Sequence, residues 1–365
     1  MKNVLFLGSL VPNEVEQKSQ YISSAANRFQ NNFVRYLKKE VLISICSYVC
    51  TPYEDIHGSS KGQDEEYDCI VKKRSKLLVC VRFFRTVKEK IKDYNNVIVY
   101  NVDYITLFVP YLAKNKKKKS ILILADYSEE DCYEKWIRRL YARFQKRVIK
   151  KYDVVIGLSE NVNRFVDINQ EFILMEGGID SAFYDYFDVE KTVSAEKVRV
   201  MYSGVLENVT GVDLLLDAIR IVQSSNLEFV FTGKGSQSEQ VERVVYEDDR
   251  VKYMGSLPYD VYMEQLGMAD ILVNPRNMNL LENQNNFPSK IMEYLATGKR
   301  IVSTRFIGWE KYSEIIDFVE SDAVEIGQKI VDISNNYISA YNSIRDYARN
   351  KLWENQIVRV INILK

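Results

Sequence analysis

The chain has 365 residues, of which 46% are hydrophobic and 27% charged. These values exclude a disordered chain and are typical of a globular protein with two domains. Basic and acidic residues balance at 50 each, so the total charge indicates no partner, but residues 1–180 have a net charge of +7 and residues 181–365 one of −7. This asymmetry predicts two domains with different partners.

The first half alternates short apolar segments with amphipathic ones, starting with an apolar run at 4–7 that we interpret as a strand and not as part of a signal peptide. This alternation predicts parallel strands joined by right-handed helical crossovers. The predicted strands cover 4–7, 42–47, 96–100, 120–124 and 154–158. The predicted helices cover 24–39, 75–94, 105–114 and 130–150.

The second half repeats this pattern, so the predicted fold class is α/β with two domains. Its predicted strands cover 198–202, 228–232, 251–254, 271–274 and 300–304, and its predicted helices 211–223, 239–246, 258–269, 288–297 and 322–336. We divide the chain into a first domain at 1–182, a polar linker at 183–197, a second domain at 198–337 and a C-terminal helix at 338–365. The sequence leaves open which domain that helix packs on.

The cysteine, histidine and hydrophobic content indicates in which compartment the protein works and which metal sites it can form. The five cysteines are an odd number, form no C-x-x-C pair and all lie in the first half, which favours free thiols in a reducing cytoplasm. His57 is the single histidine, so a zinc site of histidine and cysteine is not expected. No stretch approaches the 18 apolar residues of a membrane span.

Glycine-rich loops follow two predicted strands of the second half. Gly204 and Gly211 flank the loop after 198–202, and Gly233, Lys234 and Gly235 follow 228–232. Ligands of open parallel sheets bind at such loops, where a glycine lets a phosphate approach the backbone. The second loop begins like a dinucleotide fingerprint, but its third glycine is replaced by serine, so we do not expect a nicotinamide cofactor.

The stretch 271–304 contains the clearest candidate site. A strand ends at Asn274-Pro275-Arg276, and after a polar loop the run Phe287-Pro288-Ser289-Lys290 opens a helix that contains Glu293. The helix N-terminus and Lys290 suit a phosphate, Arg276 adds positive charge, and the Glu293 carboxylate can accept two hydrogen bonds from a ribose diol. The alternative is a surface helix with a solvated Lys290–Glu293 pair.

Residues 197–304 resemble the donor-binding domain of glycosyltransferase family 4, whose enzymes have the GT-B fold of two Rossmann-like domains with parallel sheets facing a central cleft. The resemblance rests on Tyr202-Ser203-Gly204, Gly233-Lys234-Gly235, 250–255, Ala269-Asp270 and Glu293 to Gly298, in the family's order. Enzymes of bacterial capsular and exopolysaccharide synthesis have similar N-P-R and F-P-S-K-x-x-E-Y segments. The first half matches more loosely, at 23–30, 124–126 and 176–180.

The resemblance implies a retaining, metal-independent transfer of a sugar from a nucleoside-diphosphate sugar to a glycan or lipid-linked acceptor in surface polysaccharide synthesis. It implies donor-binding roles for Gly204, Gly233, Lys234, Arg276, Phe287, Pro288, Ser289, Lys290 and Glu293. It implies catalytic roles for Asp126, Asn285 and Lys290, and acceptor-side roles for Asn27, Gln30 and Asp126. No cofactor and no metal are expected beside the nucleotide-sugar co-substrate.

The sequence departs from the family at three positions. Asn285 stands where the family has the first glutamate of its E-x7-E motif. Val205 and Thr210 stand where many members have an arginine and a lysine that bind the donor diphosphate. Two alternatives therefore stay open: a sugar-nucleotide 2-epimerase of the same fold, which the scarcity of histidine disfavours, and a non-catalytic nucleotide-sugar-binding partner subunit.

Two segments of the first half, 72–92 and 135–151, interleave basic with aromatic and aliphatic residues. Basic amphipathic helices suit an anionic membrane surface, which predicts peripheral contact with the inner leaflet of the membrane for a cytoplasmic enzyme. The alternative is that the apolar residues belong to the domain core and the charges to a solvated face. No nucleic-acid motif accompanies the charge, so no nucleic-acid partner is expected.

Overall fold

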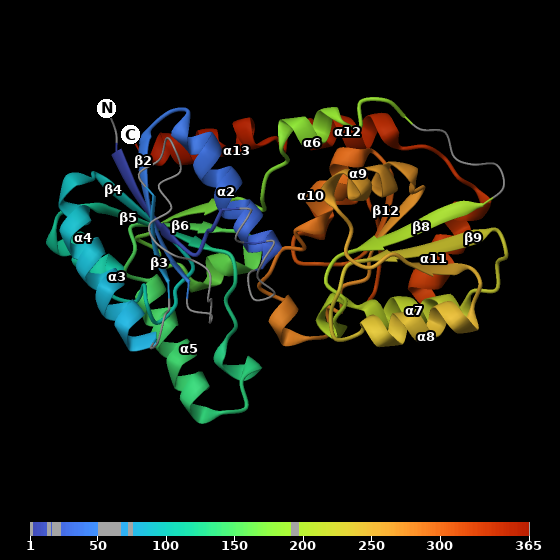
Figure 1. Ribbon diagram of the computed structural model, residues 1–365, viewed down its shortest axis with the longest axis horizontal. Coiled ribbons are helices and arrows are strands. Elements are labelled where there is room, and N and C mark those ends of the chain that lie inside the picture. Colours follow the sequence, from blue (N-terminus) through green and yellow to red (C-terminus); the bar gives the residue numbers. More distant parts are fainter. Residues whose placement is uncertain are drawn as a thin grey trace. The chain divides into compact units, whose positions relative to one another are not determined.

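The computed structural model describes residues 3–12, 16, 23–49, 67–71, 76–190 and 197–364 (Figure 1). It consists of two compact units, one formed by Met1–Gly178 with Trp353–Lys365 and the other by Ile179–Leu352. The chain therefore leaves the first unit a few residues before the predicted boundary at 182, and its last segment belongs to the first unit and not to a separate C-terminal element.

The first unit is built on a seven-stranded parallel sheet with the order β3-β2-β1-β4-β5-β6-β7. Its strands are β1 (Asn3–Gly8), β2 (Leu42–Val49), β3 (Tyr67–Val71), β4 (Asn96–Tyr100), β5 (Lys119–Leu124), β6 (Val154–Gly157) and β7 (Glu171–Leu174). The five predicted strands are confirmed, and the two edge strands β3 and β7 were not predicted. The four central strands β1, β4, β5 and β6 are buried almost throughout, which is why they read as continuous apolar runs.

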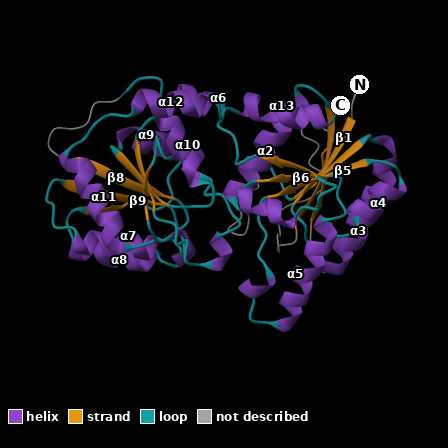
Figure 2. Cartoon of the chain, turned by 180° about the vertical axis from the view of Figure 1, so that it is seen from behind, coloured by secondary structure: helices purple, strands orange, loops and turns teal. Residues whose placement is uncertain are grey.

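Helices cover both faces of this sheet (Figure 2). On one face, α2 (Ser24–Lys38) packs against α13 (Trp353–Ile363), and their apolar residues share one core cluster with the sheet. On the other face lie α3 (Lys76–Lys90), α4 (Val109–Asn115) and α5 (Trp136–Ile149), which fill a second cluster. Short 3-10 turns at Ile91–Asp93 and Glu130–Cys132 replace the ends of two predicted helices, and another covers Glu160–Phe165.

The second unit is built on a six-stranded parallel sheet with the order β10-β9-β8-β11-β12-β13. Its strands are β8 (Val198–Ser203), β9 (Leu227–Thr232), β10 (Val251–Tyr253), β11 (Ile271–Asn274), β12 (Arg300–Thr304) and β13 (Asp317–Val319). Its helices include α7 (Val212–Ile221), α8 (Ser238–Glu247), α9 (Tyr259–Met268), α10 (Lys290–Thr297) and α11 (Ala323–Asn335). Helices α7, α8 and α11 share a core cluster with one face of the sheet, and α9 and α10 lie on the other face (Figure 1).

The predicted single C-terminal helix is wrong, because the structure has two helices there, α12 (Tyr341–Arg349) and α13. The chain between them turns to pair with the segment after Gly178, where the Ile179 amide donates to the Lys351 carbonyl at 2.8 Å. Helix α12 stays with the second unit, and the buried Arg345 guanidinium donates to the carbonyls of Tyr184 and Ala296 at 2.6 and 2.7 Å.

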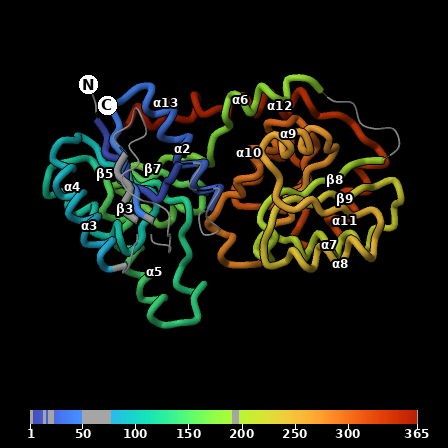
Figure 3. Tube along the Cα trace, in the orientation of Figure 1, coloured from blue at the N-terminus to red at the C-terminus, as the bar shows by residue number. Residues whose placement is uncertain are grey.

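Helix α13 returns to the first unit through Trp353, which is 1% exposed. Its ring lies edge-on to Phe29 of α2 at a centroid distance of 5.3 Å, and the chain trace in Figure 3 shows the two helices side by side. A Cβ on Gly178 would lie 2.5 Å from the Trp353 ring, so the buried position of the Trp353 side chain requires a glycine at 178. Part of the predicted linker is helical as well, since α6 covers Ser181–Asp185.

Three cysteines are described with their side chains, Cys46 buried and Cys80 and Cys132 half-buried, and all three are free thiols. His57, Cys50, residues 72–75 and the side chain of Cys69 lie outside the described part. Among the helices that the structure describes, none has both the length and the apolar character required to cross a membrane.

Candidate functional site

Two glycine loops meet backbone to backbone at the carboxyl ends of β8 and β9. The Gly204 amide donates to the Thr232 carbonyl at 3.0 Å, and the Leu206 amide donates to the Lys234 carbonyl at 3.0 Å. A Cβ on Gly233, whose φ is 126°, would lie 1.7 Å from the Gly204 carbonyl oxygen. The two loops therefore exclude any side chain at Gly233 and expose main chain at this edge of the sheet.

A third loop, after β11, packs against the first. A Cβ on Gly211 would lie 1.8 Å from the Pro275 carbonyl oxygen, so the start of α7 and the end of β11 are in close contact. The buried Asn283 amide donates to the carbonyl of Val209 at 2.8 Å, and its oxygen accepts from Nε of Arg276 at 2.7 Å. Asn283, which the sequence analysis did not single out, thereby orients the predicted Arg276.

The side chains of Lys290, Glu293 and Tyr262 form a polar cluster beside the first glycine loop. Nζ of Lys290 lies 2.9 Å from Oε2 of Glu293 and donates to the Tyr262 hydroxyl at 3.2 Å. The Tyr262 hydroxyl in turn donates to the same carboxylate oxygen. The Lys290 and Glu293 side chains keep 29% and 19% of their surface exposed, so both remain accessible to a ligand. A Cβ on Gly204 would lie 3.8 Å from Cε of Lys290, which places the cluster at the glycine loop.

Tyrosine hydroxyls connect this cluster to the end of β8. The buried Tyr294 hydroxyl accepts from the Ser203 amide at 3.1 Å, and Oγ of Ser203 lies 3.3 Å from the Tyr262 hydroxyl. Burial and the neighbouring Glu293 carboxylate raise the pKa of Tyr262 well above its usual value. Tyr262 therefore stays a protonated hydrogen-bond donor. The sequence analysis missed Tyr262 because it comes from α9, which carries no motif.

Helix α10 begins at Lys290, two residues later than predicted, with Ser289 as the N-cap residue and no capping bond from the Ser289 side chain. The Ile291 and Met292 amides donate to the carbonyls of Pro288 and Ser289 at 3.0 and 3.3 Å, so the positive end of the helix dipole, and not these two amides, attracts an anion here. The preceding residues hold this end in place: Phe287 is 8% exposed and packs against Phe306 at 5.3 Å, and Pro288 is buried.

Three other predicted residues differ in their exposure. Lys234 is exposed, Arg276 is half-buried, and Asn285 is 1% exposed in the loop before α10. Lys234 and Arg276 can therefore meet a ligand from the solvent side. Direct contact by Asn285 needs a movement of its loop.

In the first glycine loop, Thr210 stands where many family members have a basic residue, and it has a structural role there. Oγ1 of Thr210 donates to the Val205 carbonyl at 2.7 Å and receives the Glu207 amide at 3.2 Å. The Glu207 carboxylate accepts the Ser236 amide at 2.9 Å, which ties this loop to the second one. Thr210 thus fixes the loop and carries no charge. The positive charge around the glycine loops comes from Lys290, Arg276 and Lys234.

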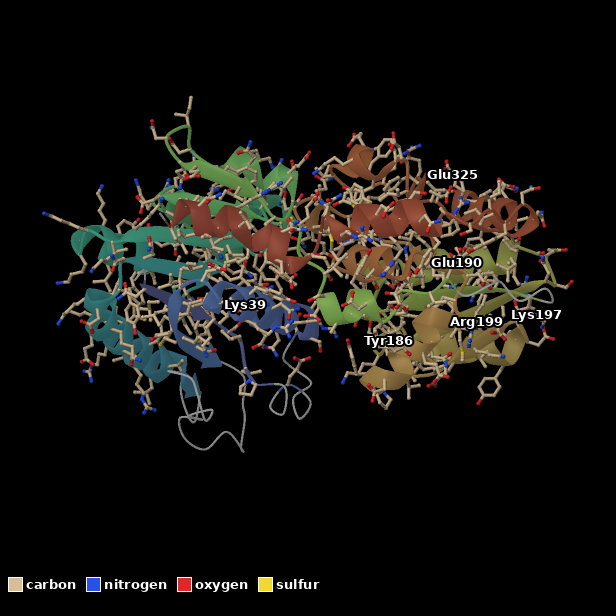
Figure 4. All side chains as sticks on the ribbon, turned by 90° about the horizontal axis from the view of Figure 1, so that it is seen from above. Lys39, Tyr186, Glu190, Lys197, Arg199 and Glu325 are labelled. Carbon is tan, nitrogen blue, oxygen red and sulfur yellow. The ribbon has the colours of Figure 1, made fainter. Side chains whose placement is uncertain are left out.

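Asp270 of the Ala269-Asp270 motif lies at the opposite edge of the sheet. Its carboxylate accepts the Arg199 amide at 2.7 Å, near the start of β8, and Figure 4 marks the position of Arg199. The pKa of Asp270 is raised above its usual value, because the effect of burial is larger than the opposing effects of the Arg199 amide and the nearby Lys299. This part of the resemblance therefore reflects a residue that joins β8 to β11 and not a ligand contact.

In the first unit, Asp126 follows β5 and its side chain is exposed. Asn101, a non-glycine residue with a φ of 58°, accepts the amides of Ala125 and Asp126 with its side-chain oxygen at 2.8 and 3.1 Å. Burial raises the pKa of Tyr100 well above its usual value, and the negative charge of Asp126 raises it further. Asn101 positions the segment that carries Asp126. The sequence analysis did not single out Asn101, and the only signal for it was its position directly after a strand.

The other two predicted acceptor-side residues are buried. Asn27 accepts the Val11 amide at 2.8 Å, and Gln30 accepts the Ser9 amide at 3.0 Å. They are 1% and 0% exposed. In this structure both residues hold the loop after β1 and do not reach the surface, so their direct contact with an acceptor stays a prediction that the geometry does not favour.

The arrangement in the second unit can bind an anion next to a polyol. Main-chain amides, a helix N-terminus and basic side chains provide the positive potential, and the Glu293 carboxylate provides a hydrogen-bond acceptor about one helical turn away. In the described part of the chain, no group of three histidine, cysteine, aspartate or glutamate side chains has the arrangement of a metal site.

The family and fold comparisons agree with this description. Residues 197–336 match the family model described as Glycosyl transferases group 1. A search of curated protein sequences gives no match.

Several solved structures have the same fold over the whole chain. HepE of Anabaena in complex with UDP superposes with a TM-score of 0.71 at 13% identity, covering 100% of both chains. The lipopolysaccharide outer core galactosyltransferase WaaB gives 0.69 at 13% identity over 99% of both chains. Sucrose-phosphate synthase from Thermosynechococcus elongatus gives 0.72 at 13% identity over 100% of this chain and 98% of that chain. The chain therefore has the GT-B fold of two Rossmann-like domains, and its residues 197–336 match a group 1 glycosyltransferase domain.

Proposed function

We propose that the protein is a glycosyltransferase that uses a nucleoside-diphosphate sugar, with its donor site at the carboxyl ends of β8, β9 and β11. The observation that carries the proposal is the Lys290–Glu293–Tyr262 cluster beside Gly204. The cluster lies within the segment that matches the family model. HepE, which has the same fold, was solved with UDP and with UDP-glucose, so a uridine nucleotide is the first candidate ligand.

The proposal assigns a separate part of the donor to each side chain. Lys290 and the first turn of α10 bind the diphosphate, and Arg276 and the exposed Lys234 add positive charge. Glu293 accepts hydrogen bonds from the ribose diol. Because Lys290 now contacts Glu293 at 2.9 Å, donor binding draws Lys290 partly from the carboxylate to a phosphate oxygen. Tyr262 keeps Glu293 in position during this exchange.

Catalysis in this proposal is electrostatic. Bond breakage at the anomeric carbon leaves negative charge on the departing nucleoside diphosphate, and the fixed amides and Lys290 stabilise that charge without a metal ion. The transfer retains the anomeric configuration, as the resemblance to family 4 implies. Asp126 on the first unit contributes to the acceptor side, and Asn285 contributes near the sugar.

The proposed acceptor is a glycan, linked to a lipid, in the synthesis of a bacterial surface polysaccharide, and the proposed location is the cytoplasm. The support for this finer assignment is the similarity of the N-P-R and F-P-S-K-x-x-E-Y segments to those of capsular and exopolysaccharide enzymes.

Binding of nucleotides by the purified full-length protein tests the proposal. We expect titration calorimetry to detect UDP, or another nucleoside diphosphate, in the presence of EDTA, with no gain on adding Mg²⁺ or Mn²⁺. Lys290→Ala should weaken that binding, and Lys252→Ala, at an exposed position on β10, should not. Absence of binding to every nucleoside diphosphate would refute the donor site.

Turnover distinguishes the two alternatives from transfer. Incubation with UDP-sugars and a membrane extract containing lipid-linked glycans should release UDP and extend a glycan. Conversion of the sugar to its 2-epimer without an acceptor would identify an epimerase. Tight donor binding without any product, in every extract tested, would identify a binding subunit.

A further inference from the structure

Helix α3 is apolar on two opposite sides. Its inner side places Val79, Phe83 and Val87 in the core, where each is at most 2% exposed. Its outer side exposes four large apolar residues. They are Leu77 (71%), Leu78 (56%), Val81 (39%) and Phe84 (39%). An amphipathic helix on the surface of a soluble domain normally has a polar outer side, so this one is unusual.

Helix α5 has the same character. Its inner side buries Ala142, Val148 and Ile149. Its exposed apolar residues are Trp136 (73%), Ile137 (60%), Leu140 (55%) and Phe144 (44%). At about 100° per residue these four positions span roughly 100° of the helix circumference, so they form one stripe. Arg139, Arg143 and Lys146 border the stripe along one edge.

The two outer sides belong to the same surface of the first unit. Both helices send their inner residues into one core cluster on one face of the sheet, so both outer sides point away from that face. Figures 1 and 2 show α3 and α5 on this face. Beside α3, Phe108 packs against Phe84 at 4.7 Å and a groove of 390 Å³ opens next to Tyr104. We call the exposed sides of α3 and α5 the outer surface.

The outer surface is strongly basic. Helix α3 has five basic residues and one acidic residue, and α5 has five basic residues and no acidic one. Arg139, Arg143 and Lys146 form ion pairs with 129–131. Arg85 of α3 and Arg147 of α5 lie on the outer sides of their helices, are exposed and have no carboxylate partner in the described part of the chain.

The opposite face of the same sheet lacks the exposed apolar residues. In the described α2 and α13, which cover it, Val358 at 49% is the one large apolar residue that is exposed. Exposed apolar residues are therefore concentrated on one side of the unit, together with unpaired positive charge. Helices with exposed apolar residues beside basic ones have the composition of a helix that lies in the interface of an anionic bilayer.

We propose that the outer surface of α3 and α5 docks the protein on an anionic lipid bilayer. Trp136, Leu140 and Phe144 enter the headgroup region, and the arginines contact lipid phosphates and acidic headgroups. A nucleic acid would match the charge, but it would leave the apolar stripe exposed to water. This inference does not depend on the proposed function, because it uses only the first unit.

Vesicle binding by the full-length protein tests the inference. The probes are vesicles of phosphatidylcholine and vesicles of phosphatidylcholine mixed with phosphatidylglycerol. We expect co-sedimentation with the mixed vesicles only, with weaker binding at high salt. Trp136 is the most exposed of the three tryptophans, so its emission should shift to shorter wavelength on the mixed vesicles.

Variants identify the surface. Arg85→Gln with Arg147→Gln should weaken binding roughly thirtyfold at low salt, about fivefold for each charge removed. Trp136→Ser with Phe144→Ser should abolish sedimentation at moderate salt. The matched control is Tyr246→Ser with Val358→Ser, which changes two exposed apolar residues on other surfaces and should bind like the wild type.

Three outcomes would overturn the inference. They are no binding to the mixed vesicles, binding that neither the double arginine variant nor Trp136→Ser with Phe144→Ser alters, and self-association in solution that Trp136→Ser with Phe144→Ser removes, which would make the surface an interface between copies. Nucleotide binding by the same variants separates this test from that of the donor site, because these residues lie outside it.

Discussion

The Tyr262 hydroxyl donates a hydrogen bond of 2.5 Å to Oε2 of Glu293, the same oxygen that Lys290 contacts at 2.9 Å. A neutral donor and a cation therefore share one carboxylate oxygen. The Lys290 and Glu293 side chains keep 29% and 19% of their surface exposed. This geometry separates the tasks of the three residues and leads to three predictions about nucleotide binding.

Glu293→Gln should weaken UDP binding by about 10- to 100-fold, since a hydrogen bond to a charged group contributes about 1.5–3 kcal/mol. The fold should remain intact because the side chain keeps its size. Titration calorimetry with UDP and 2′-deoxy-UDP checks the assignment, because the variant should lose the preference for the ribose diol. Glu264→Gln, an exposed residue of α9, is the control. An unchanged preference would remove Glu293 from the ribose site.

Lys290→Ala should reduce the affinity for UDP by about tenfold or more and leave the affinity for uridine nearly unchanged, because only the diphosphate needs the ammonium group. The ratio of the two dissociation constants is the quantity to measure. Equal losses for nucleotide and nucleoside would contradict a phosphate role.

Tyr262→Phe should cost less than Glu293→Gln, because it removes the residue that positions the carboxylate and leaves the carboxylate itself. We expect roughly 3- to 10-fold weaker UDP binding, as for the loss of one hydrogen bond of about 1 kcal/mol. In the double variant Tyr262→Phe with Glu293→Gln, the Tyr262 change should add little. Additive losses would show that Tyr262 acts separately from Glu293.

The sequence predicted the central strands well and the edges poorly. Strands such as 96–100 and 271–274 are buried on both faces, so their apolar runs mark them without ambiguity. Strands β7 and β13 have four and three residues and mix polar with apolar side chains, because each is at the edge of its sheet. The break between α12 and α13 depends on the pairing of Leu352 with Ile179, a contact between distant parts of the chain.

The parts of the candidate site that lie on a single continuous segment could be predicted from the sequence. The glycine loops and the Lys290–Glu293 pair lie on continuous motifs at strand ends. Tyr262 and Asn283 act through contacts with other elements, and no spacing in the sequence indicates those contacts. Asn27 and Gln30, which the resemblance assigned to the acceptor side, bind the adjacent main chain, and the sequence alone does not indicate those contacts.

Gly233→Ala should destabilise the second unit more than Gly255→Ala does. Both glycines have positive φ, so each substitution costs about 1–2 kcal/mol in backbone strain. At Gly255 a Cβ meets nothing within 4 Å, whereas at Gly233 it would meet the Gly204 carbonyl at 1.7 Å. Thermal denaturation of the two variants measures the difference. Similar melting temperatures would show that the two glycine loops can separate without cost.

The half-buried Asp103 should make stability depend on pH in the first unit. Its carboxylate accepts the Ile105 amide at 2.8 Å and the Tyr48 hydroxyl, yet burial is the larger effect and raises the pKa above its ordinary value of 3.8. Between the unfolded and the folded pKa the folded protein binds more protons than the unfolded one, so this group's contribution to stability falls as pH rises through that window.

Asp103→Asn removes this titration and keeps an acceptor for the Ile105 amide. The melting temperature of the variant, relative to the wild type, should therefore be lowest in acid and rise as pH increases towards neutral, where the wild type carries a half-buried charge and the variant does not. Asp217→Asn, at a half-exposed position of α7, is the control and should follow the wild type at every pH. A difference between Asp103→Asn and the wild type that is constant with pH would mean that Asp103 does not change its protonation on folding.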